Sequence, residues 1–258
     1  MDALEVAAIS ALTQGVEALA KVGLAPLQAY SENLTERIKA RLSAVADAAE
    51  HKTGDRPVEV SDRLASRILG EGAFADDLVV ADYLGGVLAA ASPDDDAASI
   101  VALIGRLSVV QLKLHYVVYR ALIEPARSIG LDWLGYEGGQ PEMIGIEIRL
   151  DEVLRAVGVE DRAVIVSAIR VLQREDLLAS PVLIGSQINS PRPDDSVWLE
   201  AHGTRLGAEL FLWGHGQRPA VAERLFDINL DAFLAEVAAC PSVDLTTAAR
   251  AGGVLYEA

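Results

Sequence analysis

The chain has 258 residues, 51% apolar and 23% charged, a balance typical of a globular protein with a sizeable core. Its formal net charge is −16, so the average surface repels phosphate and anionic lipid, and nucleic-acid binding would require a locally basic face. Cys240 is the only cysteine, which excludes an internal disulfide and a thiolate cluster for zinc or iron–sulfur.

The N-terminus does not have the pattern of a secretory signal peptide. It opens on Met1-Asp2, and charged residues interrupt the apolar stretch that follows. The most apolar run, from Leu78 to Ala91, contains Asp82 and is shorter than the roughly 20 residues that span a bilayer. We therefore expect a cytoplasmic protein of a reducing compartment, with no membrane span.

Residues 1–106 are expected to form a helical region with a possible break at 51–61, where Gly and Pro interrupt a polar stretch. The first helix of this region has an apolar stripe, and its polar face has almost no Lys or Arg, which disfavours binding to a membrane surface. We therefore expect the stripe to pack against other helices or a second copy of the chain. The stripe consists of Ile9, Leu12, Val16 and Leu19. Ser61 is expected to cap a helix over 62–69.

Three more helices are predicted between residues 73 and 130. Ser92-Pro93 separates the first from the second, which covers about 97–106 and follows an acidic turn. Ser108 begins the third, and Pro125 is expected to bend or end it.

Residues 107–216 are predicted to form a winged helix-turn-helix domain, because a helix, a short strand, two helices and two strands follow one another in that order. The strands are "MIGIEIR", "PVLIG" and "SVWLEA", and Gly158 closes the first of the two helices. The second helix, about 160–175, is expected to turn five residues inward: Val164, Ile165, Ala168, Ile169 and Leu172. A C-terminal helix and a loosely held tail follow over 217–258, so the predicted fold class is mainly α.

Two stretches resemble the abortive-infection alpha (Abi-alpha) family of bacterial phage-defence proteins. The first is "ASRILGEGAFADDLVVADYLGGVLAAASPDDDAASIVALIGRLSVVQLKLHYVVYRAL", and the second is "AIRVLQREDLLAS" with "VWLEAHGTRLGAELF". The resemblance covers about residues 61–216 and rests on the order of elements and the apolar pattern. It implies an intracellular bacterial protein associated with abortive infection, and it carries over no catalytic residues.

DNA binding is the alternative that a winged helix raises, since such domains insert their second helix into the major groove. The candidate contacts are Arg162, Arg170, Gln173 and Arg174 on that helix and Arg192 at the tip of the wing. Carboxylates bracket the helix at both ends, and residues 136–217 carry 13 acidic against 7 basic residues. Because neighbouring carboxylates cancel the gain from releasing counterions, the charge disfavours DNA.

Several candidate chemical sites have a simpler structural interpretation. His202 and His215 are expected at opposite ends of one helix capped by Thr204, too far apart to share a zinc ion. "GEGAFA", at 70–75, follows a helix rather than a strand, which disfavours a dinucleotide site. The acidic run at 94–96 lacks the spacing of a calcium loop, and the chain has no G-x-S-x-G motif.

The sequence therefore predicts a non-enzymatic interaction or sensor protein that binds a protein partner or itself, without catalytic residues, cofactor or metal. A winged-helix DNA-binding regulator is the alternative. A third hypothesis, an enzyme whose residues come together from distant segments, would require a pocket lined by converging polar groups.

Overall fold

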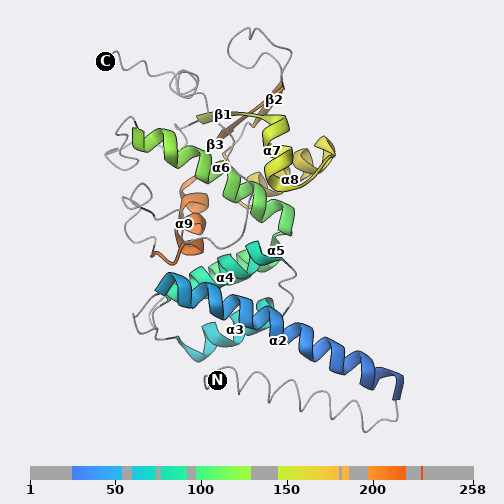
Figure 1. The fold of residues 1–258 in the computed structure, drawn as a ribbon. Helices are drawn as coiled ribbons and strands as arrows, with labels where there is room; N and C mark the ends of the chain where they lie inside the picture. Colours follow the sequence, from blue (N-terminus) through green and yellow to red (C-terminus); the bar gives the residue numbers. More distant parts are fainter. Residues whose placement is uncertain are drawn as a thin grey trace. The chain divides into compact units, whose positions relative to one another are not determined.

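The computed structural model describes residues 25–53, 60–73, 77–91, 97–128, 145–179, 182–185, 197–218 and 228. The chain divides into two compact units, Met1–Arg106 and Leu107–Ala258. Helices dominate both, and a small antiparallel sheet lies in the second (Figure 1). The prediction of a mainly α fold is confirmed. No single helix in these ranges combines the length and the hydropathy that a membrane span requires.

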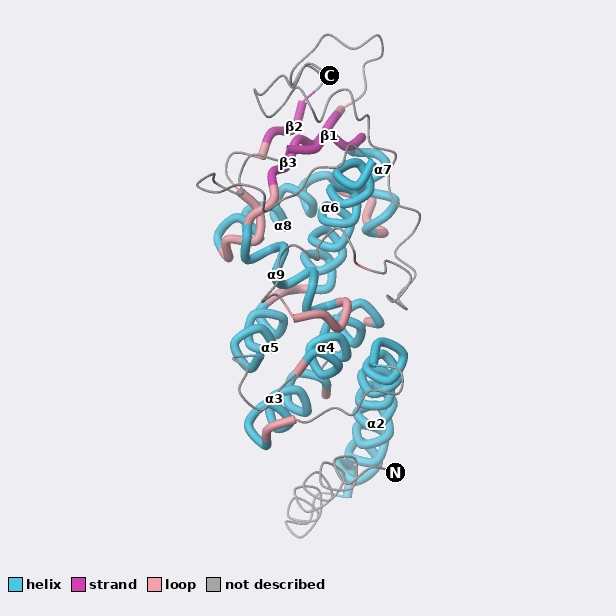
Figure 2. The backbone as a smooth tube through the Cα atoms, turned by 90° about the vertical axis from the view of Figure 1, so that its left-hand side faces the viewer, coloured by secondary structure: helices cyan, strands magenta, loops and turns pink. Residues whose placement is uncertain are grey.

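The first unit is built around an apolar helix, α4 (Leu78–Ala90), which is buried over almost its whole length. Tyr83, Leu84 and Val87 are each 0% exposed, as expected for a helix that is apolar on all sides. Three described helices contact it: α2 (Ala25–Thr53), α3 (Asp62–Gly72) and α5 (Ala97–Arg106). Figures 1 and 2 show α2 alongside α4.

The helices α2 and α4 lie in close contact at Gly85. A Cβ atom here would lie 2.6 Å from the Cβ of Ala48 and 2.7 Å from the backbone oxygen of Val45. A larger residue would therefore push the two helices apart, and glycine is the residue that permits this spacing.

A buried ion pair joins the same two helices. The Nζ of Lys52 donates to Oδ1 of Asp82 at 2.8 Å and to the backbone oxygen of Asp82 at 2.6 Å. Burial lowers the pKa of Lys52, although the attraction of Asp82 opposes this shift. The predicted break at 51–61 was thus placed too early: α2 continues to Thr53, because Lys52 and Thr53 are buried against the unit.

The start of α3 follows the sequence signal. The side chain of Ser61 accepts a hydrogen bond from the backbone N–H of Leu64, which confirms the predicted cap. The helix extends to Gly72, so the first three residues of "GEGAFA" belong to its last turn. The acidic run at 94–96 lies outside the described residues.

The second unit contains seven described elements. They are α6 (Val109–Ser128), β1 (Gly145–Arg149), α7 (Leu150–Val157), α8 (Arg162–Arg174), β2 (Leu183–Gly185), β3 (Trp198–His202) and α9 (Arg205–Gly214). The strands form an antiparallel sheet in the order β1-β3-β2 (Figure 2). Leu199 at the centre of β3 is opposite Ile148 on one side and Ile184 on the other.

The central helix of this unit is α6, which contacts β1, α7, α8 and α9. It begins with a reciprocal cap: Ser108 Oγ accepts from the N–H of Gln111, and Gln111 Oε1 accepts from the N–H of Ser108. Every side chain from Leu114 to Tyr119 is buried, so the helix is covered all round. Of the two outcomes predicted for Pro125, a bend or an end of the helix, the end is excluded, because α6 continues to Ser128.

A tight turn joins α7 to α8. Gly158 has φ +77°, the left-handed conformation that ends α7, and the carboxylate of Asp161 accepts from the N–H of Ala163 to begin α8. Four of the five predicted inward side chains of α8 are buried. The fifth, Val164, is 38% exposed, which corrects the prediction.

A network of hydrogen bonds, which we call the node, connects α6 with the start of α9 and the residues that follow α8. The Tyr119 hydroxyl accepts a hydrogen bond from the N–H of Thr204 at 2.8 Å and donates one to the backbone oxygen of Leu177 at 2.9 Å. Thr204 caps α9 by accepting from the N–H of Gly207, as predicted. His115 completes the node, since its Nε2 lies 3.0 Å from the backbone oxygen of Gly207.

The stability of the second unit should depend on pH through His115. Burial lowers the pKa of this histidine from 6.5 to about 3, so the folded protein keeps it neutral while the unfolded chain protonates it. The stabilisation is complete above about pH 6.5 and is lost as the pH falls toward about 3.

We expect His115→Gln to weaken this acid dependence, because its amide can still donate to Gly207 but does not titrate. Urea unfolding of both proteins at about pH 7 and about pH 4.5 measures the difference. Equal losses of unfolding free energy in the two proteins on acidification would contradict the prediction.

Candidate functional site

The outward surface of α8 is a polar surface of the second unit. Ala163, Ser167, Arg170 and Arg174 follow one another at helical spacing and are exposed, and Arg162 is exposed in the first turn. We call these five residues the α8 face. The helix from Arg162 to Arg174 contains no Asp or Glu, so the charges on the helix itself are all positive.

The arginines of the α8 face differ in what they contact. Arg174 donates to Oε1 of Glu175, at 3.1 Å from its Nη2, which neutralises part of its charge. Arg162 and Arg170 form no ion pair or hydrogen bond with any other residue that the structure describes. Gln173, also a predicted contact, is half-buried, and its amide donates to the backbone oxygen of Ala179 at 3.4 Å. The α8 face therefore offers two fully available guanidinium groups.

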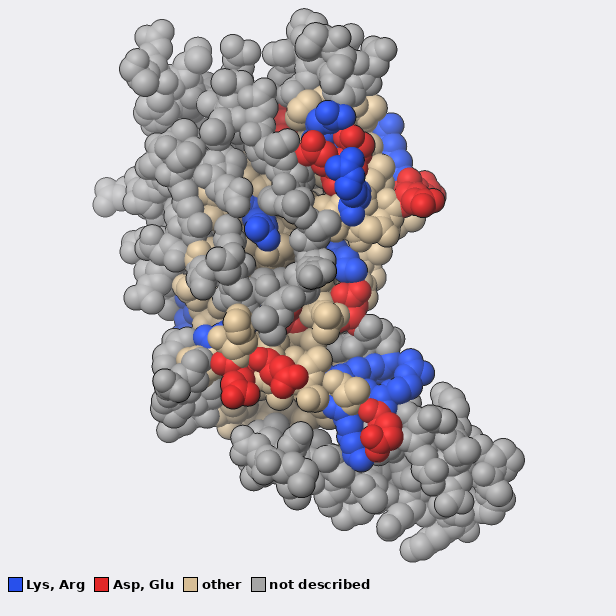
Figure 3. Space-filling model, viewed as in Figure 1, with Lys and Arg blue, Asp and Glu red and all other residues tan. Residues whose placement is uncertain are grey.

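Carboxylates lie at both ends of α8 rather than along it. Glu160 and Asp161 precede the helix and are exposed, and Asp176 follows it in a left-handed conformation with φ 58°. On the side drawn in Figure 3, the described charged side chains form small patches of both signs. The α8 face is thus a short basic segment between two acidic ends.

Other predicted site residues lie outside the part of the chain that the structure describes. They are Arg192, which the sequence predicts at the tip of a wing, and the predicted apolar stripe Ile9, Leu12, Val16 and Leu19. Cys240 lies outside it as well.

The two histidines of the candidate zinc site are at opposite ends of α9, as the sequence predicts. His202 is the last residue of β3, and its Nε2 lies 3.1 Å from Oε1 of Glu200. His215 follows α9 and contacts the backbone oxygen of Phe211 through Nδ1, at 2.9 Å. Within the described ranges, no group of three or more His, Cys, Asp or Glu side chains could hold a metal ion. The two histidines mark the ends of α9.

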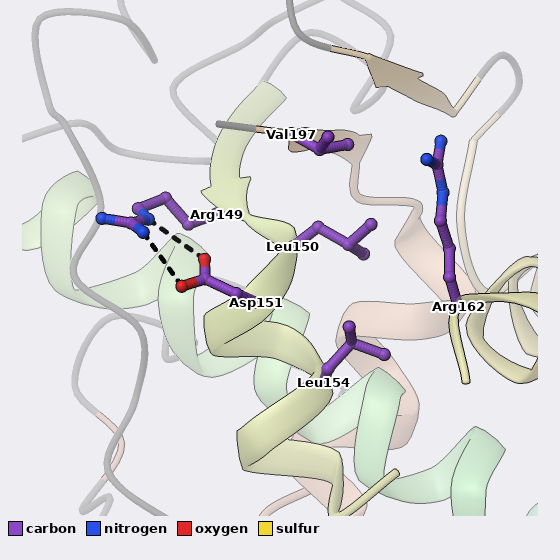
Figure 4. Close-up of a pocket in the computed structure, with 6 residues that line it drawn as sticks. All are labelled: Arg149, Leu150, Asp151, Leu154, Arg162 and Val197. Atoms are coloured by element: carbon purple, nitrogen blue, oxygen red, sulfur yellow. Dashed lines mark hydrogen bonds and ion pairs between the residues drawn. The ribbon is translucent and has the colours of Figure 1, made fainter. Parts of the chain in front are cut away.

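A hollow of about 290 Å³ lies between the starts of α7 and α8 (Figure 4). The side chains of Leu150 and Leu154 point from α7 toward Arg162 of α8, and Val197 lies above them in this view. Arg149 and Asp151 complete its lining and pair with each other on the other side of α7. The Nε and Nη2 atoms of Arg149 lie 3.0 and 2.9 Å from the two carboxylate oxygens of Asp151.

No family model, curated protein or solved structure matches this chain.

Sequence reasoning identified the arginines of α8 but missed this hollow. Its lining comes from the end of β1, the first turns of α7 and α8, and the residue before β3. These segments meet because the N–H of Leu150 donates to the backbone oxygen of Val197 at 2.9 Å. The only local sequence pattern that could have pointed to the hollow was Arg149 two residues before Asp151. This spacing is common on any protein surface, so it does not distinguish a site.

Proposed function

We propose that the second unit is a winged helix-turn-helix module and that the chain is a non-enzymatic interaction protein of bacterial phage defence. The observation that carries the proposal is the topology: α6, β1, α7, α8, β2 and β3 follow in order, and the sheet order is β1-β3-β2. This is the element order of a winged helix, in which α8 is the helix that faces the partner. The biological setting rests on the resemblance of residues 61–216 to the Abi-alpha family.

A protein partner is supported by the chemistry around α8. Val164 is 38% exposed beside the arginines, and an exposed aliphatic side chain gains by burial in an interface. The net charge of −16 and the acidic ends of α8 disfavour close approach to a polyphosphate. An acidic protein surface presents fewer fixed charges than a duplex and suits a small cluster of arginines.

Phage challenge of a bacterial host with and without the gene tests the defence role. We expect fewer plaques or altered survival of infected cells when the protein is present, and we expect Val164→Glu to remove the effect. The matched control is Leu78→Glu, at an aliphatic residue of α4 that is 61% exposed and lies in the other unit. Equal plaque counts and equal survival with and without the gene would refute the role.

DNA binding is a second candidate, favoured by the arginines of the α8 face. Arg162 and Arg170 are available, and small residues at Ala163 and Ser167 would let the helix backbone lie deep in a major groove. Arginine recognises guanine edges and phosphate through two parallel hydrogen bonds. In this case the chain would be a winged-helix regulator.

We expect Arg170→Glu with Arg174→Glu to weaken binding of duplex DNA by at least about 100-fold, since each arginine contributes about 1–3 kcal/mol at a base or phosphate. A gel-shift assay at low salt measures this. The control is Arg63→Glu with Arg67→Glu, two exposed arginines at the same spacing on α3. If the unmodified protein shifts no DNA, or if both pairs weaken binding equally, α8 is not a DNA-reading helix.

A further inference from the structure

The hollow between α7 and α8 combines an apolar wall with one available cation. Leu150, Leu154 and Val197 supply aliphatic surface, and the guanidinium of Arg162 lies across from the two leucines (Figure 4). Its volume of about 290 Å³ is just below the range of about 300–1,000 Å³ for small-molecule sites. A site of this kind takes a small ligand rather than a nucleotide cofactor.

The net charge of the lining residues determines whether the hollow favours an anionic or a cationic ligand. Arg149 and Asp151 neutralise each other, and the hydrogen bonds from Arg149 hold the pKa of Asp151 below its usual value, so this carboxylate stays ionised and paired. Arg162 has no ion-pair partner among the residues that the structure describes, which leaves the lining with one positive charge.

We propose that the hollow formed by Arg149, Leu150, Asp151, Leu154, Arg162 and Val197 binds a small amphipathic carboxylate. The carboxylate group accepts hydrogen bonds from the Arg162 guanidinium, whose planar donors match two carboxylate oxygens. The aliphatic part of the ligand packs on Leu154 and Val197, which are half-buried, and removes their apolar surface from water, whereas Leu150 is already buried.

Octanoate is a suitable probe, added to the full-length ¹⁵N-labelled protein while amide chemical shifts are recorded. We expect saturable shifts at Leu150, Leu154 and Val197. Octylammonium, which has the same chain and the opposite charge, should produce much weaker shifts at these residues. No saturable shifts with octanoate, or equal binding of the two probes, would overturn the proposal.

Two variants make the assignment specific. Arg162→Gln should weaken octanoate binding by about tenfold or more, because a hydrogen bond to a charged group is lost. Arg170→Gln removes the same charge from α8 at a residue that does not line the hollow, and should bind octanoate as the unmodified protein does. Both arginines are exposed, so both variants should fold. Equal affinity of the two variants would show that Arg162 does not hold the carboxylate.

Discussion

Replacing Lys52 by methionine is expected to lower the free energy of unfolding by about 3–5 kcal/mol, because the carboxylate of Asp82 would remain buried without its cation. The side chains of Lys52 and Asp82 are only 0% and 2% exposed. Water cannot compensate for the lost partner at such a site. Urea unfolding followed by circular dichroism measures the change.

Two controls separate the buried charge from loss of packing. Adding Asp82→Leu to Lys52→Met should restore most of the stability, since replacing both ions by apolar side chains removes the uncompensated charge. Lys39→Met breaks the ion pair between Lys39 and Glu36, whose side chains are 40% and 73% exposed, respectively. This change should lower the free energy of unfolding by less than about 1 kcal/mol. If Lys52→Met is as mild as Lys39→Met, the buried pair does not stabilise the contact between α2 and α4.

Gly207→Ala is expected to lower the free energy of unfolding by about 3 kcal/mol through overpacking. A Cβ atom at this position would collide with the hydroxyl of Tyr119 and with the backbone oxygen of Leu177. Gly70→Ala is the matched control, because no atom lies within 4 Å of a Cβ at that exposed helical position. It should be neutral or stabilising by up to about 1 kcal/mol.

A double-mutant cycle identifies the colliding atom. Tyr119→Phe alone should cost about 1–3 kcal/mol, since Thr204 N–H loses its acceptor and the oxygen of Leu177 loses its donor. In the Gly207→Ala background the same change also removes one collision. The double variant should therefore cost less than the sum of the single variants by at least about 1 kcal/mol. Strict additivity would show that the hydroxyl is not the obstacle.

The sequence predicted best where a single residue ends or begins a helix. Ser61 and Thr204 cap helices through their own side chains, and Gly158 ends α7 because it tolerates a positive φ. Each of these effects acts over three or four residues, so the local sequence contains all the information that it needs.

Predictions that depended on distant segments were less accurate. Lys52 belonged to a stretch interpreted as a polar break, yet its partner Asp82 is thirty positions away and makes the end of α2 part of the core. Val164 lies at the edge of the apolar stripe of α8, where the neighbouring elements decide burial. The hollow beside Arg162 likewise depends on the contact of Leu150 with Val197, which no local pattern contains.

The division of the chain into two units has an optical consequence. All three tryptophans, Trp133, Trp198 and Trp213, belong to the unit that begins at Leu107, whereas residues 1–106 contain none. Tryptophan emission therefore reports on the second unit alone, while the far-ultraviolet helical signal comes from both. Recording the two signals in one denaturation shows whether a change in α2, such as Lys52→Met, alters the unfolding of the second unit as well as that of the first.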